Sequence, residues 1–304
     1  ESEPSIRYRT LTELLDMPGS DPLARATCEQ IHTSQAVNRI FSRMHPDAYW
    51  GYNGHGAGVT YVDYITTHFT LAFLAELGMT RDDARIGRAV DRYLGFQQPD
   101  GDFHRHFSCL NGYNLRTLIM LGYRDDPRVQ RIIDLLVQTT RSDGGYLCDL
   151  HEGKHKTRPV KSCLRGSQKV LLGYAMLPEL WESAPCQELV AYFLNRRVYH
   201  RTSQPDEVIR DECTATLFPF TWRSGLLESL YALSKMGYGD HPALEPAWDQ
   251  LETKRDDQGR YILDWTPTRT HFKVGKRGEA NKWVTLYAHL ALKYRESSRL
   301  ALKS

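Results

Sequence analysis

Four short segments of the chain resemble one another and recur along most of its length. Asp and Gly suit polar turns because Asp caps nearby backbone groups and Gly tolerates left-handed conformations. Each segment is such a turn, closed by an aromatic residue, and the four occupy residues 45–50, 98–103, 141–146 and 256–261. After each turn and a variable loop comes an amphipathic segment that ends near Gly, which predicts a helix with a C-terminal glycine cap.

A second helix is expected between these segments. Asp126-Pro127 and Asp240-His241-Pro242 each open an apolar-periodic stretch. The first three turns follow one another at intervals of roughly 50 residues, and the interval from the third to the fourth is about twice as long. The unit without a clear turn includes residues 194–222. We therefore expect about five helix-pair repeats, an array in which each pair packs on its neighbours.

The expected helices alternate in character. Those after the loops, such as 109–121 and 163–177, are apolar over most of their circumference, whereas those before the turns are charged on one side. This pattern predicts an inner ring of buried helices and an outer ring of half-exposed helices. No alternation of strand type has a useful length, so the predicted fold class is all-α.

Composition excludes several classes of protein. Lys plus Arg is 39 and Asp plus Glu is 37 among 304 residues, so the chain lacks the large excess of positive charge that is typical of nucleic-acid-binding proteins. No apolar run approaches the roughly 20 residues that span a bilayer. Six Cys are too sparse for a disulfide scaffold. The first residues do not have the pattern of a secretion signal, so we expect a cytoplasmic protein with reduced thiols. The expected partner is a small-molecule ligand rather than a nucleic acid or a membrane.

The turn at Gln97, Pro99, Asp100, Gly101 and Phe103, with the inner helix that follows it, resembles the repeat of squalene-hopene cyclases and protein prenyltransferase β-subunits. The sequence is most similar to a bacterial group of short prenyltransferase/squalene-oxidase repeat proteins, to which no general activity is assigned. The resemblance covers nearly the whole chain. It implies one α/α toroid domain over residues 1–304 with a central cavity, N-terminal helices in 1–40, repeats in 41–295 and a tail in 296–304.

The family's acid motif matches this sequence poorly. Class II terpene cyclases carry Asp-x-Asp-Asp-Thr-Ala, and the nearest segment here is 210–215, Arg-Asp-Glu-Cys-Thr-Ala. Thr-Ala alone matches, and Glu212 stands where the central acid would be. Polyene cyclisation is therefore disfavoured, although Glu212 or Asp211 remains a candidate acid or base.

The zinc ligands of the prenyltransferases also match poorly. Asp211-Glu212-Cys213 has the Asp-x-Cys form of that family's ligand pair. The segment 222–227, however, resembles the helix that follows the pair, and this alignment places the ligand positions on Thr216 and Phe218 and the His near Lys282. The resemblance therefore implies that the family zinc site is displaced or absent.

Thiols form the first candidate site. Cys109 and Cys163 occupy equivalent places at the starts of two inner helices, His68 starts the preceding one, and Cys148 lies between the second and third. Zinc prefers tetrahedral thiolate and imidazole ligands, and a helix N-terminus favours the thiolate form. These residues are predicted to bind zinc, or Cys109 and Cys163 to act as nucleophiles. The alternative is packing, since Cys is a small hydrophobe that suits crowded helix starts.

A second candidate metal site combines Asp211, Cys213 and His271, which lie in loops before the fourth and fifth inner helices. It would supply three protein ligands and leave one position open, as catalytic zinc sites do. The alternative, which we favour from sequence, is that these loop residues share no partner.

The third candidate is a basic and aromatic lining. Lys and Arg hold phosphate oxygens, and aromatic faces attract cations, so such a lining suits an anionic head with an apolar body, such as a prenyl diphosphate. The alternative is that the basic residues lie on the outer surface and the aromatic residues fill the core. The candidate substrate-binding residues are Tyr64, Asn111, Arg165, Lys169, Trp222, Lys282 and Trp283.

These observations predict an enzyme whose site lies in the toroid cavity. The expected chemistry is that of a lyase, cyclase or transferase acting on a small, partly apolar, isoprenoid-like or anionic substrate, assisted by zinc or an activated Cys. The alternative is a non-catalytic toroid that binds a ligand or a protein, with a structural metal or none.

Overall fold

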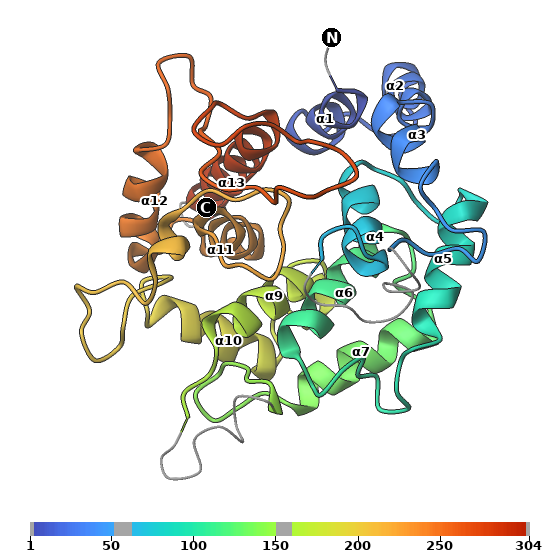
Figure 1. Ribbon diagram of the computed structural model, residues 1–304. Helices are drawn as coiled ribbons and strands as arrows, with labels where there is room; N and C mark the ends of the chain where they lie inside the picture. The colour runs from blue at the N-terminus through green and yellow to red at the C-terminus, as the bar shows by residue number, and fades with distance from the viewer. Residues whose placement is uncertain (1–2, 52–62, 150–159, 302–304) are drawn as a thin grey trace. The chain divides into compact units, whose positions relative to one another are not determined.

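Figure 1 shows a computed structural model of the chain, which describes residues 3–51, 63–149 and 160–301. Within these ranges the regular elements are helices, and extended segments pair only as isolated bridges, such as Leu217 with Trp265. The all-α prediction is confirmed. None of the helices described is both long enough and apolar enough to cross a bilayer.

The helices have the following bounds. The longer ones are α1 (Pro4–Arg9), α2 (Pro22–His32), α3 (Gln35–Phe41), α4 (Thr67–Glu76), α5 (Ala84–Leu94), α6 (Ser108–Met120), α7 (Pro127–Gln138), α9 (Leu164–Tyr174), α10 (Ala184–Leu194), α11 (Leu226–Leu233), α12 (Glu245–Glu252) and α13 (Lys282–Ala301). Short turns are η1 (Thr10–Leu14), η2 (Pro178–Leu180), η3 (Asp211–Thr214), η4 (Ser234–Tyr238) and η5 (Pro242–Leu244).

The chain divides into two compact units. Unit 1 consists of Glu1–Phe103, Thr117–Ile133 and Pro267–Lys273, and unit 2 of His104–Arg116, Asp134–Thr266 and Val274–Ser304. In unit 1, α1 packs on α2 and α4 on α5; in unit 2, α11 packs against α9, α12 and α13 (Figure 1). The expectation of a single domain over residues 1–304 stays a prediction.

The alternation of buried and half-exposed helices is present in both units. Every residue of α4 and of α11 is buried, whereas α5 buries one face only. In α9 every residue is buried except Arg165. Helices that are apolar all round are therefore the inner helices of the repeats, as their sequences predicted.

The four repeated turns share one backbone geometry. Each has its fourth residue at positive φ, at Ala48, Gly101, Gly144 and Gly259, a conformation that favours glycine. In each, the amide of the first residue donates to the carbonyl four residues on, in the pairs His45–Tyr49, Gln98–Asp102, Arg141–Gly145 and Asp256–Arg260. The sequence repeat is therefore a repeat of turn conformation.

The aromatic residue that closes a turn ties it to the next inner helix. The amides of Trp50, Tyr146 and Tyr261 donate to the hydroxyls of Thr67 in α4, Ser167 in α9 and Thr285 in α13, at 3.1, 2.9 and 2.9 Å. All three aromatic side chains are buried. The turn thus fixes where the following inner helix begins, which is the end that carries most of the candidate site residues.

Two histidines are buried in unit 1. His68 in α4 packs beside the rings of Phe69 and Tyr93, and burial lowers its pKa to about 3. His271 donates from Nε2 to the carbonyl of Ile65 at 3.0 Å, and burial lowers its pKa to about 4. Both imidazoles are therefore neutral at neutral pH.

This burial predicts acid sensitivity. Below about pH 6.5 the unfolded chain protonates both histidines while the folded chain does not, so stability is complete above that pH and is lost as pH falls. Between about pH 8 and about pH 5 we expect each histidine to remove about 2 kcal/mol from the free energy of unfolding. Urea denaturation at both pH values measures this loss. His68→Gln should reduce it by about 2 kcal/mol, whereas the exposed-site control His104→Gln should not. An unchanged loss in His68→Gln would contradict the prediction.

Candidate functional site

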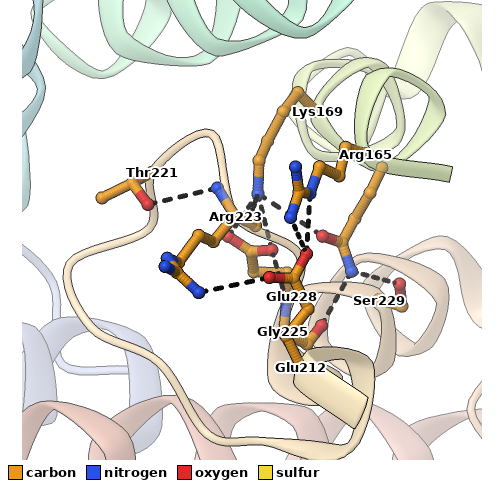
Figure 2. A network of polar contacts seen from close by, with 9 residues as sticks. Arg165, Lys169, Glu212, Thr221, Arg223, Gly225, Glu228 and Ser229 are labelled. Carbon is orange, nitrogen blue, oxygen red and sulfur yellow. Dashed lines mark hydrogen bonds and ion pairs between the residues drawn. The ribbon is translucent and has the colours of Figure 1, made fainter. Parts of the chain in front are cut away.

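A polar network in unit 2 joins α9 to the segment that leads into α11 (Figure 2). Arg165 and Lys169 lie one helical turn apart on the same face of α9. Glu212 comes from η3, Arg223 from the segment before α11, and Glu228 from the first turn of α11. The network has a buried half and a half that reaches solvent.

The buried half is an ion pair. Nζ of Lys169 lies 2.6 Å from both carboxylate oxygens of Glu228, and the two side chains are 0% and 1% exposed. Nζ also donates to the backbone carbonyl of Arg223 at 2.6 Å, and Glu228 accepts from the amide of Gly225 at 3.2 Å. The pair therefore holds the backbone at residues 223–225.

Gln168 strengthens the same attachment. Its Nε2 donates to the carbonyl of Gly225 at 2.7 Å and to the hydroxyl of Ser229 at 2.8 Å. Two consecutive residues of α9 thus bind the turn into α11. Because α9 fixes this backbone, the side chains of Trp222 and Arg223 start from a fixed position.

Burial shifts both members of the ion pair. It lowers the pKa of Lys169 and raises the pKa of Glu228, and in each case the charge of the partner opposes the shift. A single buried charge is very costly, whereas a pair that shares one proton carries no net charge. Each residue therefore depends on the presence of the other.

The second half of the network is partly exposed. Nε of Arg165 donates to Oε1 of Glu212 at 2.7 Å, and Nη1 of Arg223 donates to Oε2 at 3.3 Å. The side chains of Arg165, Glu212 and Arg223 are 26%, 16% and 32% exposed. Nε of Arg223 is buried and has no hydrogen-bond partner in the described part of the chain. Two guanidinium groups share one carboxylate, so the cluster has an excess positive charge and unused donors.

An indole ring flanks this cluster. The guanidinium carbons of Arg165 and Arg223 lie 4.8 and 5.4 Å from the ring centroid of Trp222. Arginine stacks on aromatic faces while its N–H edges remain available to an anion. The cluster is therefore preorganised to bind carboxylate, sulfate or phosphate next to an apolar ring.

The structure brings together three of the predicted substrate-binding residues, Arg165, Lys169 and Trp222, and adds the predicted acid Glu212. Lys169 does not reach solvent, so its place is that of an anchor beneath the cluster rather than a ligand contact.

The other predicted substrate-binding residues have different surroundings. Trp283 is buried and stacks on Phe218 with ring centroids 4.7 Å apart, and Asn111 is buried in α6. Lys282 is exposed at the start of α13, and Tyr64 belongs to unit 1, where it packs on Phe69. Trp283 therefore fills the core, the alternative that the sequence left open for the aromatic residues.

The predicted zinc site at the thiols finds no matching cluster among the residues described. Within the described ranges, no group of three or more His, Cys, Asp and Glu side chains is placed to hold a metal ion. Cys163 is the residue just before α9 and makes no capping hydrogen bond with its side chain, Cys109 lies in the first turn of α6, and Cys148 is buried. His68 belongs to unit 1, and the three cysteines of the predicted site belong to unit 2. Zinc at these four residues therefore gains no support from the structure.

Crowding explains small residues at these helix starts. A Cβ added at Gly166 of α9 would lie 2.5 Å from Oγ of Ser108, next to Cys109. The starts of α6 and α9 are thus in close contact, which favours packing as the reason for Cys at position 109.

The second predicted metal site, Asp211, Cys213 and His271, is also unsupported. Asp211 is exposed at the start of η3, whereas Cys213 is buried and burial raises its pKa to about 12. A protonated thiol is a poor zinc ligand. His271 is buried in unit 1, where it is bonded to Ile65.

Sequence reasoning missed Glu228 and Gln168. A signal was available: Lys169 and Glu228 are charged residues within two inner helices. Charged residues are rarely fully buried without a partner, so two such positions in neighbouring inner helices indicate a pair.

No family model matches the chain, and no curated protein matches it. A solved polysaccharide lyase is similar over 99% of this chain and 91% of its own, with a TM-score of 0.53 and 15% identity. A glycosyl hydrolase of family 88 from Bacteroides vulgatus is similar over 98% and 91%, with a TM-score of 0.53 and 14% identity. The fold is that of the α/α toroids. The fold class predicted from the repeats is therefore confirmed. The type II terpene cyclase MstE from Scytonema has a TM-score of 0.48 at 12% identity, over 98% of this chain and 87% of its own.

Proposed function

We propose that the protein is an enzyme that cleaves an anionic carbohydrate at the Arg165–Glu212–Arg223 cluster. The single observation that carries this proposal is two guanidinium groups sharing one carboxylate beside the indole of Trp222. The printed names of the two similar toroids, a polysaccharide lyase and a glycosyl hydrolase, support a carbohydrate substrate. Of the isoprenoid-like and anionic substrates that the sequence left open, this proposal takes the anionic one.

The proposed reaction is β-elimination from a uronate. Arg165 and Arg223 bind the sugar carboxylate and stabilise the negative charge that develops on it, which makes the neighbouring C–H more acidic. Glu212, displaced from the two arginines by the substrate, takes that proton. The C–H electron pair forms the C=C bond, the glycosidic C–O bond breaks, and the leaving oxygen is protonated by water.

The test is a panel of acidic and neutral polysaccharides. Ultraviolet absorbance detects the unsaturated uronate of a lyase, and reducing-end assays detect hydrolysis. Glu212→Gln should lower kcat by about 100-fold or more while binding is retained. Glu207→Gln, in an exposed loop of the same unit, is the matched control and should leave kcat unchanged. Binding without cleavage would favour the non-catalytic toroid. A protein that neither binds nor cleaves any polysaccharide of the panel would overturn the proposal.

A further inference from the structure

Beyond the cluster, arginine and tryptophan side chains alternate in unit 2. Arg223 lies against two indoles, Trp222 at 5.4 Å and Trp265 at 4.6 Å from its guanidinium carbon to the ring centroids. Arg165 flanks Trp222 at 4.8 Å, and Arg277 flanks Trp265 at 5.6 Å. We call Arg165, Trp222, Arg223, Trp265 and Arg277 the Arg–Trp row.

The row carries more positive charge than its surroundings neutralise. Glu212 is the carboxylate bound to Arg165 and Arg223. Asp264, next to Trp265, pairs with Lys254 at 2.9 Å, and Glu279 pairs with Lys276 at 3.4 Å. Among the described residues, Arg277 has no carboxylate within ion-pair distance.

Arg277 is nevertheless held in place. Its Nη2 donates to the carbonyl of Thr266 at 2.8 Å, and its guanidinium lies beside Trp265. An exposed arginine that is fixed by its own chain, rather than by a counter-charge, keeps donors directed to solvent. The guanidinium carbons of Arg223 and Arg277 lie 4.6 and 5.6 Å from the ring centroid of Trp265, so their separation cannot exceed these two distances combined.

We infer that the Arg–Trp row binds an acidic oligosaccharide through at least two of its negative charges, one at Arg165 and Arg223 and a second at Arg277. This inference rests on the proposed function and specifies its substrate class as a chain with repeated charges. A single acidic sugar reaches one anion position, whereas a chain with charges on successive units reaches both. The indole of Trp265 lies between the two positions, and together with Trp222 it supplies apolar edges for the sugar rings.

Calorimetry with galacturonate and its oligomers tests the inference. Affinity should rise at least 10-fold between the monomer and the trimer, because a second charge-assisted contact forms. Arg277→Gln should remove about 10-fold of the trimer affinity and leave monomer binding unchanged. Lys276→Gln, an adjacent exposed cation that already has a carboxylate partner, is the matched control and should change neither.

Three results would overturn the inference: equal affinity for monomer and trimer, an Arg277→Gln variant that binds the trimer as tightly as the native chain, or tighter binding of a single-stranded DNA oligomer than of the trimer. The titrations are done with Glu212→Gln as well, so that binding is read without turnover. Length-dependent binding without any cleavage by the native chain would retain this inference and overturn the proposed enzyme. Cleavage of oligomers that does not depend on Arg277 would retain the proposed enzyme and overturn this inference.

Discussion

Replacement of Lys169 by methionine is expected to lower the free energy of unfolding by about 3–5 kcal/mol. Methionine fills a similar space, but Glu228 loses the ammonium group that lies 2.6 Å from both of its oxygens. The amide of Gly225 remains as a donor, which is too little to stabilise a fully buried carboxylate. Urea denaturation followed by circular dichroism measures the loss.

The pH dependence of this variant separates a charge effect from a packing effect. Burial raises the pKa of Glu228 even in the native chain, and without Lys169 that burial is unopposed. The folded variant then binds a proton at position 228 more readily than the unfolded chain does, so its loss of stability relative to the native chain should shrink as pH falls from about 7 towards about 4.5. A loss that does not vary with pH would indicate packing alone.

The double variant Lys169→Met, Glu228→Leu is the control. Apolar residues of similar volume often replace a buried ion pair at little cost, so most of the lost stability should return. A double variant as unstable as the single one would contradict the assignment of the loss to the unpaired carboxylate. The double variant also removes the hydrogen bond from Lys169 to the carbonyl of Arg223, so it should bind acidic oligosaccharide more weakly although it folds.

The features that the sequence predicted correctly are local ones. The turns could be recognised because the same few residues at the same positions require the same backbone, including positive φ at Gly101, Gly144 and Gly259. The inner helices could be recognised because burial on every side leaves an apolar sequence. Both signals lie within a single repeat, so they need no knowledge of which segments are neighbours.

The candidate site depends on neighbours, and there the prediction was partial. Lys169 and Glu228 are 59 residues apart, and Arg165 and Glu212 are 47 apart. The sequence of one segment does not show which residue of a distant segment lies opposite a given charge. Composition at the helix starts selected Arg165 and Trp222, which lie in contact in the structure, but it did not distinguish the buried Lys169 from a residue that reaches solvent.

The cysteines show a second limit. A cysteine can be present because a crowded helix start needs a small residue or because a metal needs a ligand, and the sequence alone does not distinguish the two. Cys109 and Cys163 occupy equivalent places in their repeats, which favoured a shared site, yet equivalence in a repeat also follows from a packing requirement that recurs. The crowding at Ser108 and Gly166 is the structural observation that favours packing as the reason for Cys109.

That crowding continues along α6 and predicts that Gly112→Ala destabilises the protein by about 3 kcal/mol. A Cβ at Gly112 would lie 2.5 Å from both the carbonyl carbon of Lys169 and the amide nitrogen of Val170. These are backbone atoms of α9, so the clash cannot be relieved by a side-chain rotation. The helix must shift, and it carries Arg165 and Lys169 with it.

Gly87→Ala in α5 is the matched control, because it is the same change within a helix. Its Cβ would meet only the hydroxyl of Tyr123, at 3.8 Å, so the higher helix propensity of Ala should stabilise the protein by up to about 1 kcal/mol. The two substitutions are thus expected to have opposite signs in the same urea experiment. If Gly112→Ala also stabilised the chain, α6 and α9 would not be in backbone contact. The anchor beneath the Arg165–Glu212–Arg223 cluster would then lack the rigid support that its proposed role requires.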